Sequence, residues 1–254
     1  MQHGNYSVSV VVAGRNTDTF RPAFEYNHTD DKTYIEGRDG SKFKLNFKNH
    51  SAKRVLAVTS VDGLSVMNGQ PAGQDKQGYI VPAFGTLEID GWRLNDRETA
   101  AFVFGDKGES YGALSGAGTA NSGVIGIMVY EEKVPEIHLR SIRPFNTSPM
   151  LGSRGLTKGI ATKGGGTDWL EAEQTRGGNF DMGTGFGAKQ DSSVRRVSFE
   201  SKDDPSAMVV MYYASRKALE ARGIKLIEAA VPTAQPNPFP AYTGCKPPAG
   251  WTGK

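Results

Sequence analysis

The chain has 254 residues, of which 37% are hydrophobic, and its 30 basic and 27 acidic side chains give a net charge of +3. That length suits one large β domain, or one domain with a smaller appendage. The near balance of charge argues against a nucleic-acid-binding protein, and the lack of any apolar stretch of about 18 residues argues against a membrane-spanning one.

The N-terminal sequence, MQHGNYSV, has neither the basic nor the apolar region of a signal peptide, so we expect synthesis in the cytoplasm. The single cysteine, Cys245, excludes an internal disulfide and a paired-cysteine metal or redox site. We expect it to be an inert or exposed thiol.

Short strands dominate residues 1–133. The clearest is 41–49, where Phe43, Leu45 and Phe47 alternate with polar residues and should point inward. Asp-Gly and Asn-Gly pairs between the strands favour turns. This rhythm predicts an antiparallel β-sandwich of jelly-roll type. Its strands are expected near residues 6–13, 33–37, 41–49, 54–60, 63–67, 78–82, 86–90, 98–104 and 123–131.

The character of the sequence changes after residue 133. Residues 134–168 are rich in proline and glycine and are interpreted as a linker or long loop. Residues 169–231 are predicted to form a smaller β unit, with strands near 194–199, 207–213 and 224–231 and one short helix at 215–223. Ser215 should cap that helix and Gly223 should end it. The proline-rich residues 232–254 are expected to form an extended arm.

The sequence contains no local signature of catalysis. The four histidines form no metal-binding array, and no nucleophile elbow or phosphate-binding loop is present. We therefore expect no catalytic residue, no metal and no cofactor, and predict that the protein is not an enzyme. A carboxylate-based hydrolase stays open as a minor alternative, with four acids on predicted strands as candidates, namely Glu36, Asp62, Glu88 and Asp90.

The aromatic residues allow a second interpretation. Trp92 is expected to pack over one end of the sandwich with Arg93 lying across it. Alternatively, Trp92, Tyr79 and Tyr111 could form a stacking surface for a sugar, which would make the protein a glycan- or surface-binding module.

Several segments together resemble a known group of proteins. They include YIEGRDG at 34–40, RVLAVTSVDGLSV at 54–66, IDGWR at 89–93 and GTGFG at 183–187. The chain resembles, from about residue 5 to residue 228, a poorly described family of tailed bacteriophages and proteobacteria. The resemblance implies no enzymatic activity. For phage members it implies a virion structural role, such as a capsid decoration or cement protein.

The resulting hypothesis is a non-enzymatic virion structural protein, located in the virion, that binds the head surface. Its expected partners are the major capsid protein or other virion proteins and copies of itself, with no nucleic acid and no membrane. Aromatic and arginine side chains often anchor protein interfaces. The predicted partner-binding residues therefore lie in the long loop and the arm: Arg143, Phe145, Arg154, Phe239, Tyr242 and Trp251.

Overall fold

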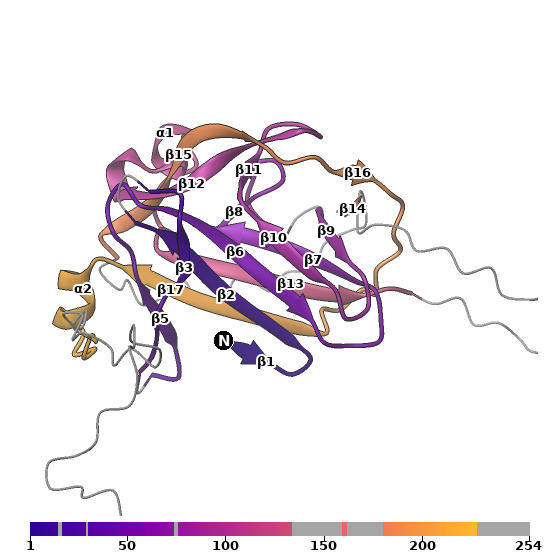
Figure 1. Ribbon diagram of the computed structural model, residues 1–254, viewed down its shortest axis with the longest axis horizontal. Helices are drawn as coiled ribbons and strands as arrows, with labels where there is room; N and C mark the ends of the chain where they lie inside the picture. The colour runs from indigo at the N-terminus through magenta and orange to yellow at the C-terminus, as the bar shows by residue number, and fades with distance from the viewer. Residues whose placement is uncertain (15–16, 29, 74–75, 134–158, 162–179, 228–254) are drawn as a thin grey trace, which may run out of the picture.

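A computed structural model describes residues 1–14, 17–28, 30–73, 76–133, 159–161 and 180–227. Two β-sheets pack face to face around a shared core (Figure 1). The chain is therefore a mainly-β protein with a sandwich-like arrangement, as the sequence predicted. Among the described residues, no helix is both long enough and apolar enough to cross a membrane.

The first sheet runs in the order β1-β2-β6-β12-β11, while β3 pairs with β2, β10 with β6 and β15 with β12. Its strands are β1 (Gln2–His3), β2 (Tyr6–Ala13), β3 (Phe20–Pro22), β6 (Lys42–Asn49), β10 (Thr86–Ile89), β11 (Gly91–Arg93), β12 (Glu98–Asp106) and β15 (Met182–Asp191).

The second sheet runs in the order β16-β14-β9-β7-β13-β17-β5-β4, and β8 pairs with β7. Its strands are β4 (Glu25–Asn27), β5 (Thr33–Glu36), β7 (Val55–Val61), β8 (Leu64–Ser65), β9 (Gly78–Val81), β13 (Val124–Glu131), β14 (Gly159–Ala161), β16 (Arg195–Arg196) and β17 (Ala207–Ala214). Most pairs are antiparallel, whereas β17 with β5 and β14 with β16 are parallel.

The core between the sheets follows the predicted alternation. Phe43, Leu45 and Phe47 of β6 are all buried, as expected for the inner face of a strand. The ring of Phe43 stacks on Phe104 of β12 at 4.2 Å and lies 6.3 Å from Tyr213 of β17, in the opposite sheet. Aromatic packing therefore joins the two layers.

The sequence predicts a smaller β unit over 169–231 and leaves open whether it packs on the sandwich; the strand pairing places its described strands in both sheets. β15 pairs along nearly the whole of β12 in the first sheet, and β17 lies between β13 and β5 in the second. Both strands complete the sandwich itself. A local pattern cannot reveal this, because it shows that a segment is a strand but not which distant strand it joins.

Among the residues that the structure describes, there are three short helices: η1 (Lys107–Glu109), α1 (Tyr111–Leu114) and α2 (Arg216–Ala221). The predicted caps of α2 are confirmed, since Ser215 Oγ accepts a bond from the Ala218 amide at 3.2 Å and Gly223 has a φ of 80°. The predicted strand at 224–231 is not formed over its described residues, 224–227. Of the predicted linker, only β14 is described, and the arm at 232–254 lies outside the described residues.

Candidate functional site

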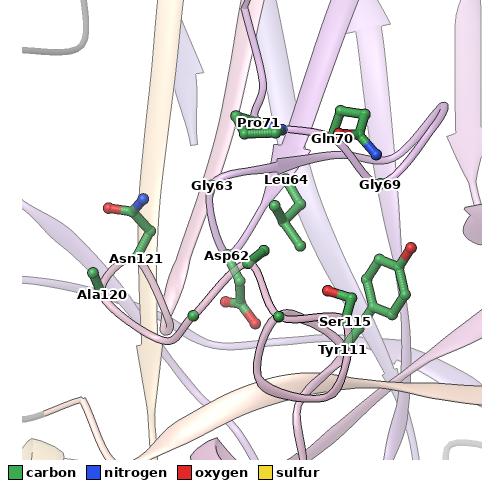
Figure 2. A pocket seen from close by; sticks show the side chains of 13 residues that line it. Asp62, Gly63, Leu64, Gly69, Gln70, Pro71, Tyr111, Ser115, Ala120 and Asn121 are labelled. Carbon is green, nitrogen blue, oxygen red and sulfur yellow. The ribbon is translucent and has the colours of Figure 1, made fainter.

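A hollow of about 350 Å³ opens at the end of the sandwich where β7 stops (Figure 2). Tyr111 stands on one side of it and Asn121 on the other, with Pro71 above. The hollow is lined by the turn after β7, the loop that follows β8, and α1 with the loop beyond it. The lining residues are Asp62, Gly63, Leu64, Gly69, Gln70, Pro71, Tyr111, Ser115, Gly116, Ala117, Gly118, Ala120 and Asn121.

Asp62 is the one ionisable carboxylate in this lining, and it is buried. Its oxygens accept bonds from the Gly123 amide at 2.9 Å, the Thr184 amide at 2.7 Å and the Tyr213 hydroxyl at 2.5 Å. The Tyr213 hydroxyl also lies 2.8 Å from Thr184 Oγ1. These partners come from β15, β17 and the residue before β13, so Asp62 joins strands of both sheets.

Burial governs the ionisation of this group. It raises the pKa of Asp62, although the three hydrogen bonds that the carboxylate accepts act in the opposite direction. Burial and the neighbouring carboxylate also raise the pKa of Tyr213 well above its ordinary value, so the phenol keeps its proton and can donate it. Both oxygens of Asp62 thus accept hydrogen bonds from the fold, two on Oδ1 and one on Oδ2.

The other candidate acids are held apart from one another. Glu36 pairs with Arg216 at 3.0 Å and Glu88 pairs with Lys44 at 2.9 Å. Asp90 accepts a bond from Thr99 at 3.1 Å. No two of these acids share a partner, so the described contacts assemble no carboxylate pair. Within the same part of the chain, no three histidine, cysteine or acidic side chains gather as a metal site.

The proposed sugar-stacking surface does not form. Trp92 and Tyr79 are 3% and 1% exposed, which leaves neither ring available to a ligand. Trp92 donates to the Gly185 carbonyl at 3.2 Å, and Arg93 binds the Tyr79 hydroxyl at 2.8 Å. Trp92 is packed in the core as expected, but Arg93 lies over the ring of Tyr79 and not over Trp92. The alternative in which Trp92 and Tyr79 present a stacking face does not hold.

Tyr111 behaves differently from these two residues, because it is only half-buried at the edge of the hollow. Its ring lies 4.8 Å from Trp92 on the inside and 5.1 Å from Phe186 on the outside. Phe186 is 48% exposed, and Leu114 of α1 is 75% exposed. An apolar surface thus flanks the hollow.

A second feature occupies the other end of β7. Phe84, in the turn between β9 and β10, is 67% exposed and has a φ of 56°. A left-handed backbone costs an aromatic residue about 1–2 kcal/mol relative to ordinary conformations. The exposed ring gains little packing energy to offset that cost, so the outward position of Phe84 destabilises the isolated fold slightly.

Asn49 provides the rigid base for this turn. Its side chain is fully buried and donates to the carbonyls of Lys53 at 2.7 Å and Pro82 at 2.9 Å. Its Oδ1 accepts bonds from both the amide and the hydroxyl of Ser51. The Phe84 amide in turn donates to the Ser51 carbonyl at 3.1 Å. The turn and the β6–β7 loop therefore form one connected unit, here called the Phe84 knob (residues 49–53 and 82–85).

The six residues predicted to bind partners all lie outside the described residues, so they stay predictions: Arg143, Phe145, Arg154, Phe239, Tyr242 and Trp251. The sequence favours a core or rim position for Phe84, and Ala83-Phe84-Gly85 resembles any turn with a glycine, so its projecting ring is not evident from the sequence. Sequence reasoning missed Leu114 and Phe186, since no strong local pattern marks α1 or β15.

Comparison of the chain with protein-family models, with curated proteins and with solved structures found no match.

Proposed function

We propose that this chain is a non-enzymatic structural protein that binds other proteins, and specifically a bacteriophage virion component that decorates or cements the head surface. One observation carries the binding part of the proposal: the Phe84 knob presents an exposed aromatic ring on a rigid base. The virion assignment is supported by the sequence motifs that resemble the phage family.

The energetics of the knob favour a binding role. Interfaces depend on a few aromatic or arginine side chains that enter pockets of the partner. Holding such a side chain in its bound position beforehand removes part of the entropic cost of association. The backbone of Phe84 is strained and its turn is tied to Asn49, which are the properties expected of a preorganised anchor.

The chemistry of the hollow supports the non-enzymatic part. A hydrolase needs a carboxylate able to take up or release a proton during reaction. Asp62 binds Gly123, Thr184 and Tyr213 within the fold, and Glu36 and Glu88 each pair with a different basic residue. The described residues therefore offer a binding surface more readily than a reaction centre.

The test is co-sedimentation of the chain with intact particles from its source, quantified by mass spectrometry. A copy number comparable to that of the capsid protein is expected. Absence from the particles would overturn the virion assignment. Expression of Phe84→Gly should lower particle occupancy, whereas Phe84→Tyr, which keeps the ring, should preserve it. Equal occupancy of the wild type and Phe84→Gly would remove the knob from the binding surface.

A further inference from the structure

The knob and the hollow lie at opposite ends of the same strand. The Phe84 amide binds the Ser51 carbonyl just before β7 begins, and Asp62 follows the last residue of β7. β7 has seven residues, which span roughly 20 Å as an extended strand. In Figure 1, α1 lies near one end of the sandwich and the turn after β6 near the other. The two features therefore meet only between different copies of the chain.

Their sizes match. A cavity of about 150 Å³ is enough to hold benzene, and the hollow measures about 350 Å³. Its walls include the side chains of Leu64, Pro71 and Tyr111, and positive-φ glycines keep the turns around it thin. A Cβ at Gly69, for example, would stand 2.3 Å from the Tyr111 hydroxyl oxygen. The hollow is large enough for a phenyl ring, which would contact Leu64, Pro71 and Tyr111 within a lining that is otherwise largely polar.

Their charges are also complementary. Lys48 lies at the knob end of β6, where Thr86 is its partner across the strands. Glu109 lies in η1, two residues before Tyr111. Both side chains are exposed, and neither has an ion-pair partner among the residues that the structure describes. Lys53 and Arg54, by contrast, are paired with Glu131 and Glu132 of the same copy.

We propose that copies of this chain associate head to tail, with Phe84 of one copy entering the hollow beside Tyr111 of the next and Lys48 facing Glu109. Such a contact joins two different surfaces, so a pair of copies still has a free knob at one end and a free hollow at the other. Further copies can add there, and the assembly grows into a ring or a row. The inference rests on the proposed function in treating the chain as an assembly protein, and it identifies one partner as a second copy.

Sedimentation of the purified full chain over a range of concentrations tests the proposal. The wild type should self-associate reversibly. Phe84→Gly removes the plug and Ala117→Trp fills the hollow, and each should weaken association by about thirtyfold, as for a typical hot spot. Phe84→Tyr and Ala117→Ser are the matched controls and should associate like the wild type.

Mixing the two defective variants gives the sharpest result. Phe84→Gly keeps its hollow and Ala117→Trp keeps its knob, so the mixture should form a 1:1 dimer that does not grow further. A monomeric wild type would overturn the proposal. So would a self-associating wild type whose two variants fail to pair, because that result indicates a contact between identical surfaces.

A charge reversal provides an independent measurement if Ala117→Trp does not fold. Lys48→Glu and Glu109→Lys should each weaken association, and combining them in one chain should restore it. Failure of the double variant to recover would contradict the assigned pairing. These experiments use only purified chain, so a monomeric protein that still sediments with particles would refute the head-to-tail contact and leave the proposed function standing.

Discussion

Tyr213 donates a hydrogen bond of 2.5 Å to Asp62, a residue 151 positions earlier in the chain. Both groups are buried, and the amides of Gly123 and Thr184 also donate hydrogen bonds to the carboxylate. A polar network of this kind stabilises a fold only when every member is satisfied. Its integrity therefore decides whether the late strands β15 and β17 stay attached to the early ones.

Removing the Tyr213 hydroxyl should destabilise the protein. Tyr213→Phe keeps the ring in the core but deprives Asp62 of a donor and Thr184 Oγ1 of a partner, which should cost about 1–3 kcal/mol in the free energy of unfolding. Urea denaturation measures it. Tyr34→Phe is the matched control, because its hydroxyl binds Asp30 at the surface and should cost less. Equal losses of stability in the two variants would show that the hydrogen bond to Asp62 contributes no more than a bond at the surface.

The raised pKa of Asp62 predicts a pH dependence. Burial disfavours the ionised carboxylate in the folded state, so the folded protein binds the Asp62 proton more tightly than the unfolded chain does. The contribution of Asp62 to the free energy of unfolding should therefore be greatest below its ordinary pKa of 3.8. It should be lost as the pH rises through the higher pKa of the folded state.

Comparison with Asp62→Asn isolates this effect. Acidification also reduces the stability contributed by groups whose pKa is lowered in the fold, such as Glu131 beside Lys202 and Lys53. These groups are the same in both proteins, so their effect cancels in the comparison. The stability of the wild type relative to Asp62→Asn should increase as the pH is lowered from about 7 to about 4. A constant or decreasing difference in denaturation experiments would mean that the pKa of Asp62 is not raised.

Asn49 should be essential to the knob. Asn49→Ala leaves the carbonyls of Lys53 and Pro82 and the amide of Ser51 without their buried partner, at a cost of about 2–4 kcal/mol. Asn46→Ala, on the outer face of the same strand, should change stability by less than about 0.5 kcal/mol. Hydrogen exchange at the Phe84 amide should accelerate in the first variant only.

Phe84 should be dispensable for stability. Glycine adopts a positive φ without steric cost, whereas alanine keeps the strain and loses the ring. Phe84→Gly should therefore be at least as stable as the wild type, and Phe84→Ala less stable than Phe84→Gly by about 1 kcal/mol. Thermal unfolding distinguishes these results. A large loss in Phe84→Gly would mean that the ring packs within the fold and is not held for a partner.

Much of the strand content follows from local pattern. The alternation in β6 correctly assigns Phe43, Leu45 and Phe47 to the core, and the cap signals of Ser215 and Gly223 place α2 within one or two residues. Both patterns depend on neighbours along the chain. β15, in contrast, has four amino acids typical of turns, glycine at 183, 185 and 187 and Asp191, and is not recognisable as a strand. Pairing with β12 overrides its weak intrinsic preference.

Neither candidate binding feature could be predicted from the sequence. An Ala-Phe-Gly turn gives no sign that the phenylalanine will adopt a positive φ, since that conformation is imposed by bonds to Ser51 and to the loop around Asn49. The hollow is formed by two stretches that lie about 40 residues apart in sequence, 62–71 and 111–121. Its carboxylate, Asp62, looks like an ordinary turn residue until distant strands bury it.

The sequence by itself determined that this is a mainly-β protein, where most of its strands lie and where α2 begins and ends, because alternation and capping act between residues a few positions apart. Only the tertiary structure decided that β15 and β17 complete both sheets, that Asp62 is buried among Gly123, Thr184 and Tyr213, and that Phe84 projects from one end while a hollow opens at the other. These outcomes depend on contacts between distant segments, whose energies exceed the local preferences of the residues involved.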